Sequence, residues 1–178
     1  MTGDSRNDRA TSNEVPVSSR PDNRVLLRND AQLSESFFAL TRWLRRIYAI
    51  DRGVLVIRSE GGPRLSAIST WRDGQGREGL SLNLPLDSSL FEKVAEHGQV
   101  YTEDFCGAFS GNFFERKLLL DDDSRSFVVQ PLKSEGRVLG LLGYSSRQST
   151  AFAMLEEGAL DDVASEFGAI IENKVCQQ

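Results

Sequence analysis

The sequence predicts an α+β domain built on a central, mostly antiparallel sheet of six strands. Ser126–Ser146 contains two β-rich runs around a polar turn, which is typical of a β-hairpin. The second run, Val138–Tyr144, has no polar alternation, so we expect it in the middle of a sheet that is covered on both faces. Amphipathic segments near the two ends of the chain supply helices for one covering layer.

Length, charge and cysteine content exclude several classes of protein. The chain has 178 residues, enough for one domain with its own core. Its net charge of -5 argues against a general nucleic-acid binder, which normally carries a basic face. No apolar run reaches the roughly 20 residues that span a bilayer, and the N-terminus has no secretory signal pattern. Because Cys106 and Cys176 lie far apart, we expect no disulfide framework and a cytoplasmic location.

Met1–Arg24 is predicted to be a disordered tail, with a single domain over residues 25–178. The tail is polar and holds few apolar residues, so folding cannot bury enough surface to offset its entropy. In Asp30–Ile50, apolar residues recur at steps of three and four, which predicts one amphipathic helix. The apolar stripe of this helix comprises Leu33, Phe37, Leu40, Leu44 and Ile47.

Three strands are expected after the first helix. Gly53–Ser59 and Arg64–Trp71 flank a Gly-Gly-Pro turn and form a predicted hairpin. Arg72–Gly79 is polar and contains three glycines, so we predict a loop there. Leu80–Leu86 places a leucine at every second position, which is the period of a half-buried strand.

A short capped helix and a variable segment follow. Ser89 and Glu92 have the spacing of a capping box, which predicts a helix over Leu90–His97. Gly98 ends this helix, and Val100–Thr102 is predicted to be a short strand.

Glu103–Arg125 is expected to be irregular apart from one helix over Asn112–Leu120. The sheet then closes with the strands Ser126–Leu132 and Val138–Tyr144, and the last predicted helix is Ala151–Val175. The apolar stripe of that helix comprises Leu155, Leu160, Val163, Phe167, Ile170 and Ile171. Its small residues Ala164 and Gly168 leave room for a close neighbour, which we expect to be another helix.

Five short pieces of this sequence, in this order, resemble the GAF domain family, a small-molecule sensor module related to the PAS fold. The resemblance covers about Ser34–Asn173. The pieces are LPLDSSL at 84–90, GQVYTED at 98–104, RSFVVQPL at 125–132, GRVLGLL at 136–142 and AF at 151–152.

The resemblance implies terminal helices on one face of the sheet and a pocket, covered by loops and a helix, on the other. The expected lining of this pocket comprises Trp71, Phe105, Cys106, Phe109, Phe113, Phe114, Ser126 and Val128. Ligands in the family include cyclic nucleotides, bilins, haem and 2-oxoacids, and many members bind nothing known and act as dimerisation modules. The cyclic-nucleotide signature of the family is not matched here, and the sequence identifies no cofactor.

Cys106 is the one candidate for covalent chemistry. A bilin-attachment cysteine of the family is usually followed by histidine, whereas Gly107 follows here. The nearest charges, Glu103 and Asp104, are acidic and would not favour a thiolate. GAF-like reductases of free methionine sulfoxide group several cysteines at the pocket rim, so a lone Cys106 would need an external thiol. An inert loop cysteine is the alternative.

Other candidate residues also have ordinary explanations. His97 precedes Gly98 at a helix C-terminus, where the dipole favours an imidazolium, so we expect a cap rather than a metal or haem ligand. Adjacent carboxylates cannot all face one ion, so Asp121–Asp123 are expected to form a solvated turn, and no metal site is predicted. The phenylalanines of the variable segment form either a second small core or a lid over a ligand.

We therefore expect a sensory or regulatory module that binds a small molecule and, lacking an output domain, acts through a separate partner protein. A homodimer formed by the first and last helices is also expected, since the first carries arginines and the last carries acids that can pair within or between chains. The alternatives are a ligand-free dimerisation module and, second, a thiol-dependent reductase that uses Cys106.

Overall fold

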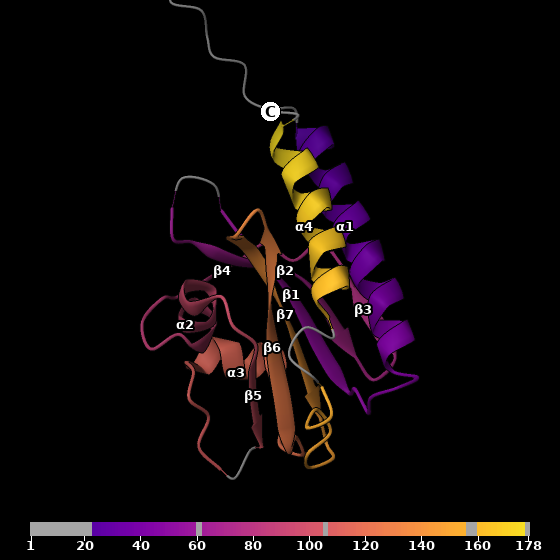
Figure 1. The fold of residues 1–178 in the computed structure, drawn as a ribbon, viewed down its shortest axis with the longest axis vertical. Helices are drawn as coiled ribbons and strands as arrows, with labels where there is room; N and C mark the ends of the chain where they lie inside the picture. Colours follow the sequence, from indigo (N-terminus) through magenta and orange to yellow (C-terminus); the bar gives the residue numbers. More distant parts are fainter. Residues whose placement is uncertain (1–22, 60–61, 105–106, 156–159, 177–178) are drawn as a thin grey trace, which may run out of the picture.

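A twisted antiparallel sheet separates two helical layers in the computed structural model of the chain (Figure 1). The structure describes residues 23–59, 62–104, 107–155 and 160–176. Within these ranges the sheet has seven strands in the order β3-β2-β1-β7-β6-β5, and β4 pairs with β2 beside β3. The predicted α+β class and antiparallel sheet are confirmed. Within the same ranges, none of the helices combines the length and hydropathy needed to cross a bilayer.

The elements follow the predicted order with one addition. The helices are α1 (Asn23–Leu44), α2 (Leu90–His97), α3 (Phe113–Leu119) and α4 (Asp161–Cys176). The strands are β1 (Arg52–Arg58), β2 (Leu65–Arg72), β3 (Gln75–Arg77), β4 (Leu82–Leu84), β5 (Tyr101–Asp104), β6 (Ser126–Ser134) and β7 (Arg137–Ser146). The additional strand, β3, lies in the predicted loop. Asp73 and Gly74 both have positive φ there and turn the chain back onto β2.

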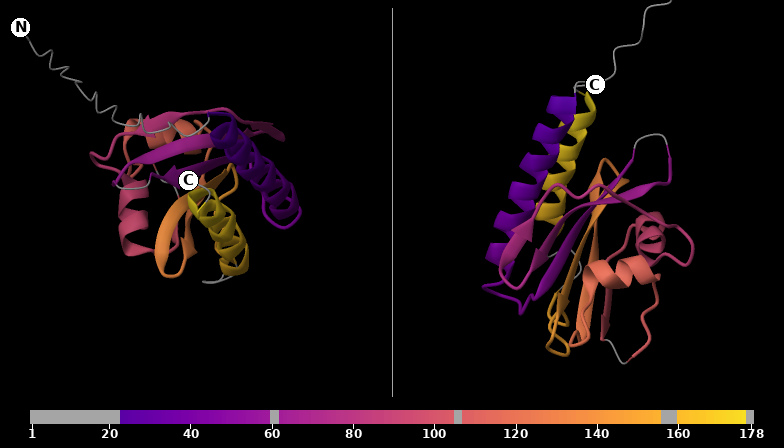
Figure 2. Two further views of the ribbon diagram at one scale, coloured as in Figure 1. Left: turned by 90° about the horizontal axis from the view of Figure 1, so that it is seen from above. Right: turned by 180° about the vertical axis from the view of Figure 1, so that it is seen from behind.

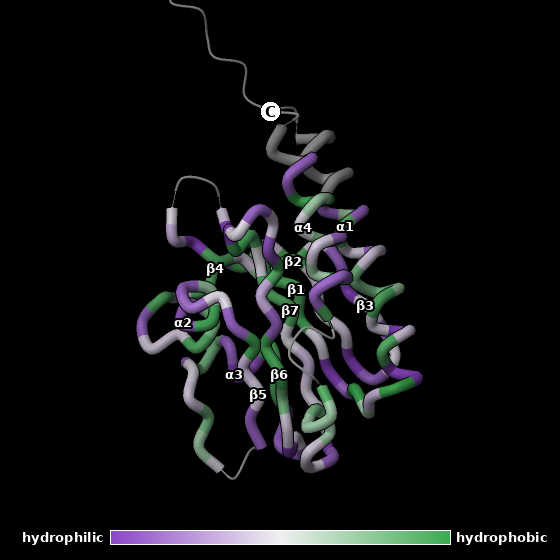
Figure 3. The backbone as a smooth tube through the Cα atoms, in the orientation of Figure 1, coloured by the Kyte–Doolittle hydropathy of each residue, from purple (hydrophilic) through white to green (hydrophobic). Residues whose placement is uncertain are grey.

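The β6–β7 hairpin occupies the predicted central place. Glu135 and Gly136 form its two-residue turn, with φ of 48° and 77°. β7 lies between β1 and β6. Its consecutive residues Leu141 and Leu142 belong to different hydrophobic clusters, one on each face of the sheet. The strand is therefore covered on both faces, as its continuous apolar run predicts (Figure 3).

α1 and α4 lie side by side on one face of the sheet (Figure 2). Their apolar residues meet the sheet in the first hydrophobic cluster, which includes Leu33, Phe37, Leu142, Phe167 and Ile171. Two buried hydrogen bonds also join α1 to the strands. The hydroxyls of Ser34 and Ser69 bond to each other, and Thr41 bonds to the Tyr144 hydroxyl at 3.0 Å.

The first helix differs in its limits from the predicted Asp30–Ile50. It begins at Asn23, inside the predicted tail Met1–Arg24, whose residues 1–22 lie outside the described residues. It ends at Leu44, after which the Arg46 and Ile47 amides bond to carbonyls only three residues back and tighten the turn. That tightening rotates Ile47 off the stripe, so its side chain is 60% exposed. Ile50 is buried instead, and the placement of Ile47 on the stripe was wrong.

The last helix is also shorter than predicted. α4 begins at Asp161, and Ala151–Leu155 form turns in place of its expected first residues. Gly168 packs against a strand and not against a helix, because a Cβ there would lie 2.5 Å from the carbonyl oxygen of Lys133 in β6. The absence of a side chain at this position brings α4 close to the sheet.

This contact reverses the usual effect of replacing a helical glycine. Gly168→Ala should destabilise the protein by about 1–3 kcal/mol, since the steric cost exceeds the roughly 1 kcal/mol gain in helix propensity. Urea unfolding followed by circular dichroism measures the difference. Ser165→Ala, at an exposed position of the same helix, is the matched control and should stabilise by a few tenths of a kcal/mol. A stabilised Gly168→Ala variant would show that α4 does not approach β6 this closely.

Candidate functional site

The second layer of the fold is organised around one buried carboxylate, that of Glu115. Its oxygens accept hydrogen bonds from the Ser89 hydroxyl, from the amides of Leu90 and Phe91 at 2.9 and 3.1 Å, and from the Asn112 amide at 3.2 Å. The side chain is fully buried. Because these donors belong to the first residues of α2 and α3, one anion satisfies the N-termini of both helices.

This arrangement modifies the capping box expected at Ser89. Ser89 does cap α2, since its hydroxyl oxygen accepts from the Glu92 amide at 2.9 Å. The Glu92 carboxylate does not reciprocate; it lies 3.7 Å from the Arg58 guanidinium. Glu115 supplies the missing anion from another helix. The complete capping box belongs instead to α3, with Asn112 and Glu115 as its two members.

The C-terminal end of α3 is held by polar groups from the sheet. Arg52, at the start of β1, donates to the carbonyl oxygens of Leu120 and Lys117, and the Ser145 hydroxyl of β7 donates to Leu119. Such carbonyls have no partner within a helix, and a cation is favoured beside them. α3 is therefore anchored to the rest of the fold at both ends.

The space between α2, α3 and the sheet is filled by apolar side chains. Phe91, Leu119, Phe127 and Leu141 are almost completely buried in the second hydrophobic cluster. Phe109, one of the predicted lining residues, packs against Phe127 with ring centroids 5.5 Å apart. Of the two roles considered for the phenylalanines, Phe109 serves as core.

The residues expected to line one pocket lie in different parts of the fold. Trp71 and Val128 are buried on the opposite face of the sheet, in the cluster beneath α1 and α4. Trp71 contacts Phe38, and the guanidinium groups of Arg42 and Arg45 lie about 6 Å from its ring. The structure does not bring Trp71 and Val128 together with Phe109, because the alternation of side chains along β2 and β6 places these two residues on the other face of the sheet.

The remaining lining residues divide into three groups. Ser126 is buried, and its hydroxyl donates to the Gln148 carbonyl at 2.7 Å. Phe113 and Phe114 stand in edge contact on the outer side of α3 and are 65% and 45% exposed. Phe105 and Cys106 lie outside the described residues, so thiol chemistry at Cys106 stays a prediction.

Among the clefts that open between described residues, two share no lining residue. The first, which we call the β5–α4 cleft, has a volume of about 220 Å³. It is lined by Thr102, Glu103, Asp104, Ser126, Phe127, Phe152 and Ala153. The second, which we call the α3 cleft, has a volume of about 350 Å³ and lies where α3 meets β1 and β2.

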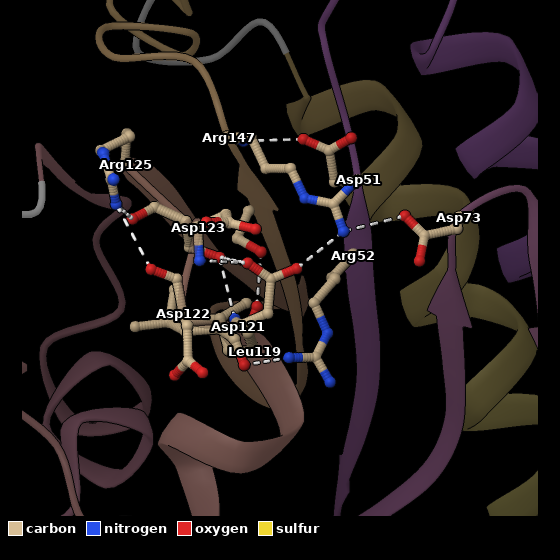
Figure 4. Close-up of polar contacts among 12 residues, drawn as sticks. Asp51, Arg52, Asp73, Leu119, Asp121, Asp122, Asp123, Arg125 and Arg147 are labelled. Carbon is tan, nitrogen blue, oxygen red and sulfur yellow. Dashed lines mark hydrogen bonds and ion pairs between the residues drawn. The ribbon is translucent and has the colours of Figure 1, made fainter.

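The acidic turn forms as expected, and beside it lies an arginine that links several carboxylates. Asp121 accepts from the Asp123 amide and the Ser124 hydroxyl through one oxygen, and from Arg147 at 3.0 Å through the other. Arg147 also pairs with Asp73 at 3.3 Å (Figure 4). His97 behaves as the predicted cap, since its Nδ1 lies 2.7 Å from the Lys93 carbonyl at the end of α2.

Sequence reasoning missed Glu115 and Arg52. A signal for Glu115 was present, because Asn112 stands three residues before it in the capping-box spacing. Arg52 carried no comparable signal, since an arginine before an apolar strand is most often exposed. The capping pattern of Glu115 does not tell that its side chain also reaches the first amides of α2.

The family model of the GAF domain matches residues 32–171. The chain belongs to the GAF domain family. No curated protein matches the chain.

Three solved structures illustrate the shared fold. The GAF domain of a phosphoenolpyruvate-protein phosphotransferase from Coxiella burnetii is 18% identical, with a TM-score of 0.63, and the match covers 87% of this chain and 95% of that one. A type II free methionine-R-sulfoxide reductase from Thermoplasma acidophilum is 14% identical, with a TM-score of 0.60 and coverage of 82% and 96%. The GAF domain of a sensor histidine kinase from Bacillus halodurans is 18% identical, with a TM-score of 0.55 and coverage of 88% and 97%.

The buried Glu115 carboxylate yields a stability prediction. Glu115→Ala should cost more than about 3 kcal/mol, because it leaves the amides of Leu90, Phe91 and Asn112 without their acceptor. Glu115→Gln should cost less, since its one amide oxygen still accepts. Urea unfolding measures both. Glu96→Gln, on the exposed side of α2, is the control and should change stability by less than about 0.5 kcal/mol.

Asp121 yields a pH prediction. Burial alone raises the pKa of its carboxyl, but the hydrogen bonds from Arg147, Ser124 and the Asp123 amide outweigh burial and hold that pKa below its ordinary value. The ionised group therefore stabilises the fold above its unfolded-state pKa of about 4, and this contribution is lost as the pH falls through the lower folded-state pKa. Between about pH 5 and about pH 2, the wild type should lose more stability than Asp121→Asn.

Denaturant unfolding at each pH checks this expectation. Asp123→Asn, at an exposed position of the same turn, controls for the change in net charge. Equal losses in the wild type and in Asp121→Asn would contradict a lowered pKa at Asp121.

Proposed function

We propose that this GAF domain is a regulatory module that responds to a small molecule and passes the response to a partner protein. The observation that carries the proposal is the β5–α4 cleft. It opens between the ends of β5 and β6 and the turn segment that leads to α4. An occupant would contact the sheet edge and the approach to α4 together.

Hydrogen bonds across this region support such a coupling. The Thr150 amide donates to Asp104 of β5 at 2.9 Å, and the Ser126 hydroxyl of β6 donates to the Gln148 carbonyl. Phe152 lines the cleft and is buried in the cluster beneath α1 and α4, where its ring centroid lies 6.2 Å from that of Tyr48. A ligand that displaces Phe152 would therefore change the packing of α4, because such cores are dense and do not deform continuously.

The polar lining favours ligands with hydrogen-bond donors. Thr102, Glu103 and Asp104 are among the lining residues. One oxygen of Glu103 accepts from the Tyr101 and Ser110 hydroxyls and one oxygen of Asp104 accepts from the Thr150 amide, so each carboxylate has a second oxygen for a ligand. Small polyols, amino acids and amines have this chemistry. We place the output at the layer formed by α1 and α4. At the end of α1 and just beyond it, the exposed Trp43 and Ile47 supply apolar surface for a homodimer or a partner protein.

A second candidate is a ligand-free interaction module. The specific observation in its favour is the filled space beneath α2 and α3, where the family resemblance had implied a pocket. This candidate expects an oligomeric state that no small molecule changes.

Thermal-shift screening of polyols, amino acids and small amines distinguishes these two functions. At least one compound should raise the melting temperature of the wild type and change its oligomeric state in light scattering. Ala153→Trp should abolish the shift, because Ala153 is an exposed residue of the cleft and a large ring would fill the space. Gln99→Trp, at an exposed position outside both clefts, should keep it. If no compound stabilises the wild type, the interaction module is favoured.

A further inference from the structure

The α3 cleft concentrates positive charge in an acidic chain. Its lining includes four basic residues, Arg52, Arg72, Arg116 and Lys117, and two acidic residues, Asp121 and Asp122. The chain as a whole has a net charge of -5. A cleft with an excess of cations attracts anions strongly when its walls exclude part of the solvent.

Arg52 and Arg72 stand directly opposite each other on β1 and β2. Like charges in such positions repel, and burial together with the charge of Arg72 lowers the pKa of the Arg52 guanidinium. Among the described residues, no carboxylate lies within ion-pair distance of either side chain. The nearby Asp73 and Asp121 are engaged by Arg147. An added anion would relieve this repulsion.

The guanidinium of Arg52 also retains an unused donor. Its residue is only 5% exposed, and its two terminal nitrogens donate to carbonyls at the end of α3. Its Nε is buried and has no hydrogen-bond partner among the described residues. Because this Nε is itself buried, Arg52 acts on an anion in the cleft through the charge of its guanidinium and not through a hydrogen bond from Nε.

The cleft has an apolar wall beside these cations. The ring of Phe113 is largely exposed, and the Lys117 ammonium lies 5.5 Å from its centroid. The volume of about 350 Å³ falls in the range of small-ligand sites. The site therefore offers guanidinium groups for an anionic head and an aromatic face for an apolar body.

We propose that the α3 cleft binds a small organic dianion whose apolar part lies against Phe113. Phosphate monoesters and dicarboxylates share this chemistry. Arg72 and Lys117 contact the anionic head. The buried Arg52 attracts the head through the electrostatic field of its guanidinium. The site is separate from the β5–α4 cleft, so it does not depend on the function proposed for that cleft.

Calorimetric titration of the full chain with phenyl phosphate and with phthalate tests the proposal and distinguishes the two kinds of dianion. At least one should bind saturably, with one site per chain, and inorganic phosphate should bind about fivefold more weakly because it lacks the ring. Phe113→Ala should reduce the affinity for the aromatic dianion to about that of inorganic phosphate.

Arginine variants at the two ends of one hairpin provide the decisive comparison. Arg72→Ala should weaken binding about tenfold or more, and Arg72→Lys should recover only part of the loss, because lysine cannot form a bidentate contact. Arg64→Ala removes an exposed arginine at the far end of the β1–β2 hairpin and should leave the affinity unchanged. The absence of saturable binding by both dianions, or equal affinities of Arg72→Ala and Arg64→Ala, would overturn the proposal.

Discussion

The buried carboxylate of Glu115 determines how the second layer of this fold is held together. A buried charge is strongly unfavourable unless several hydrogen-bond donors surround it. Here the donors are amides at the starts of α2 and α3, which have no acceptor within their own helices. Each helix is too short to be stable alone. The hydrogen bonds of both helices to one carboxylate therefore contribute stability that longer helices would obtain from their own backbone hydrogen bonds. Arg52 and Ser145 complete the anchoring by satisfying the other end of α3.

This fixed layer determines where the described part of the fold is filled and where it is open. Buried apolar side chains fill the described space beneath α2 and α3 in the middle of this face. The β5–α4 cleft and the α3 cleft both lie where strands end; acidic side chains line the first, and both basic and acidic side chains line the second. The first touches the approach to α4, whereas the second touches α3 and the β1–β2 hairpin.

The functional side chains were harder to predict than the fold, for a geometric reason. Trp71, Val128 and Phe109 all have the composition of a pocket lining, but composition does not reveal which face of a strand a residue occupies once bulges shift the register. Trp71 lies beneath α1, where Phe38 and two arginines cover it. Glu115 escaped notice because its capping pattern identifies its own helix but not the second helix whose amides it accepts.

Local patterns by themselves determined the order of the elements, the central place of Val138–Tyr144 and the limits of α2, because alternation, helical periodicity and capping depend on neighbours in sequence. Tertiary structure alone decided that Glu115 joins two helices, that Gly168 packs against the Lys133 carbonyl and that Arg52 faces Arg72. These contacts join residues far apart in the chain. Their geometry follows from strand register and helix placement, which no short segment encodes.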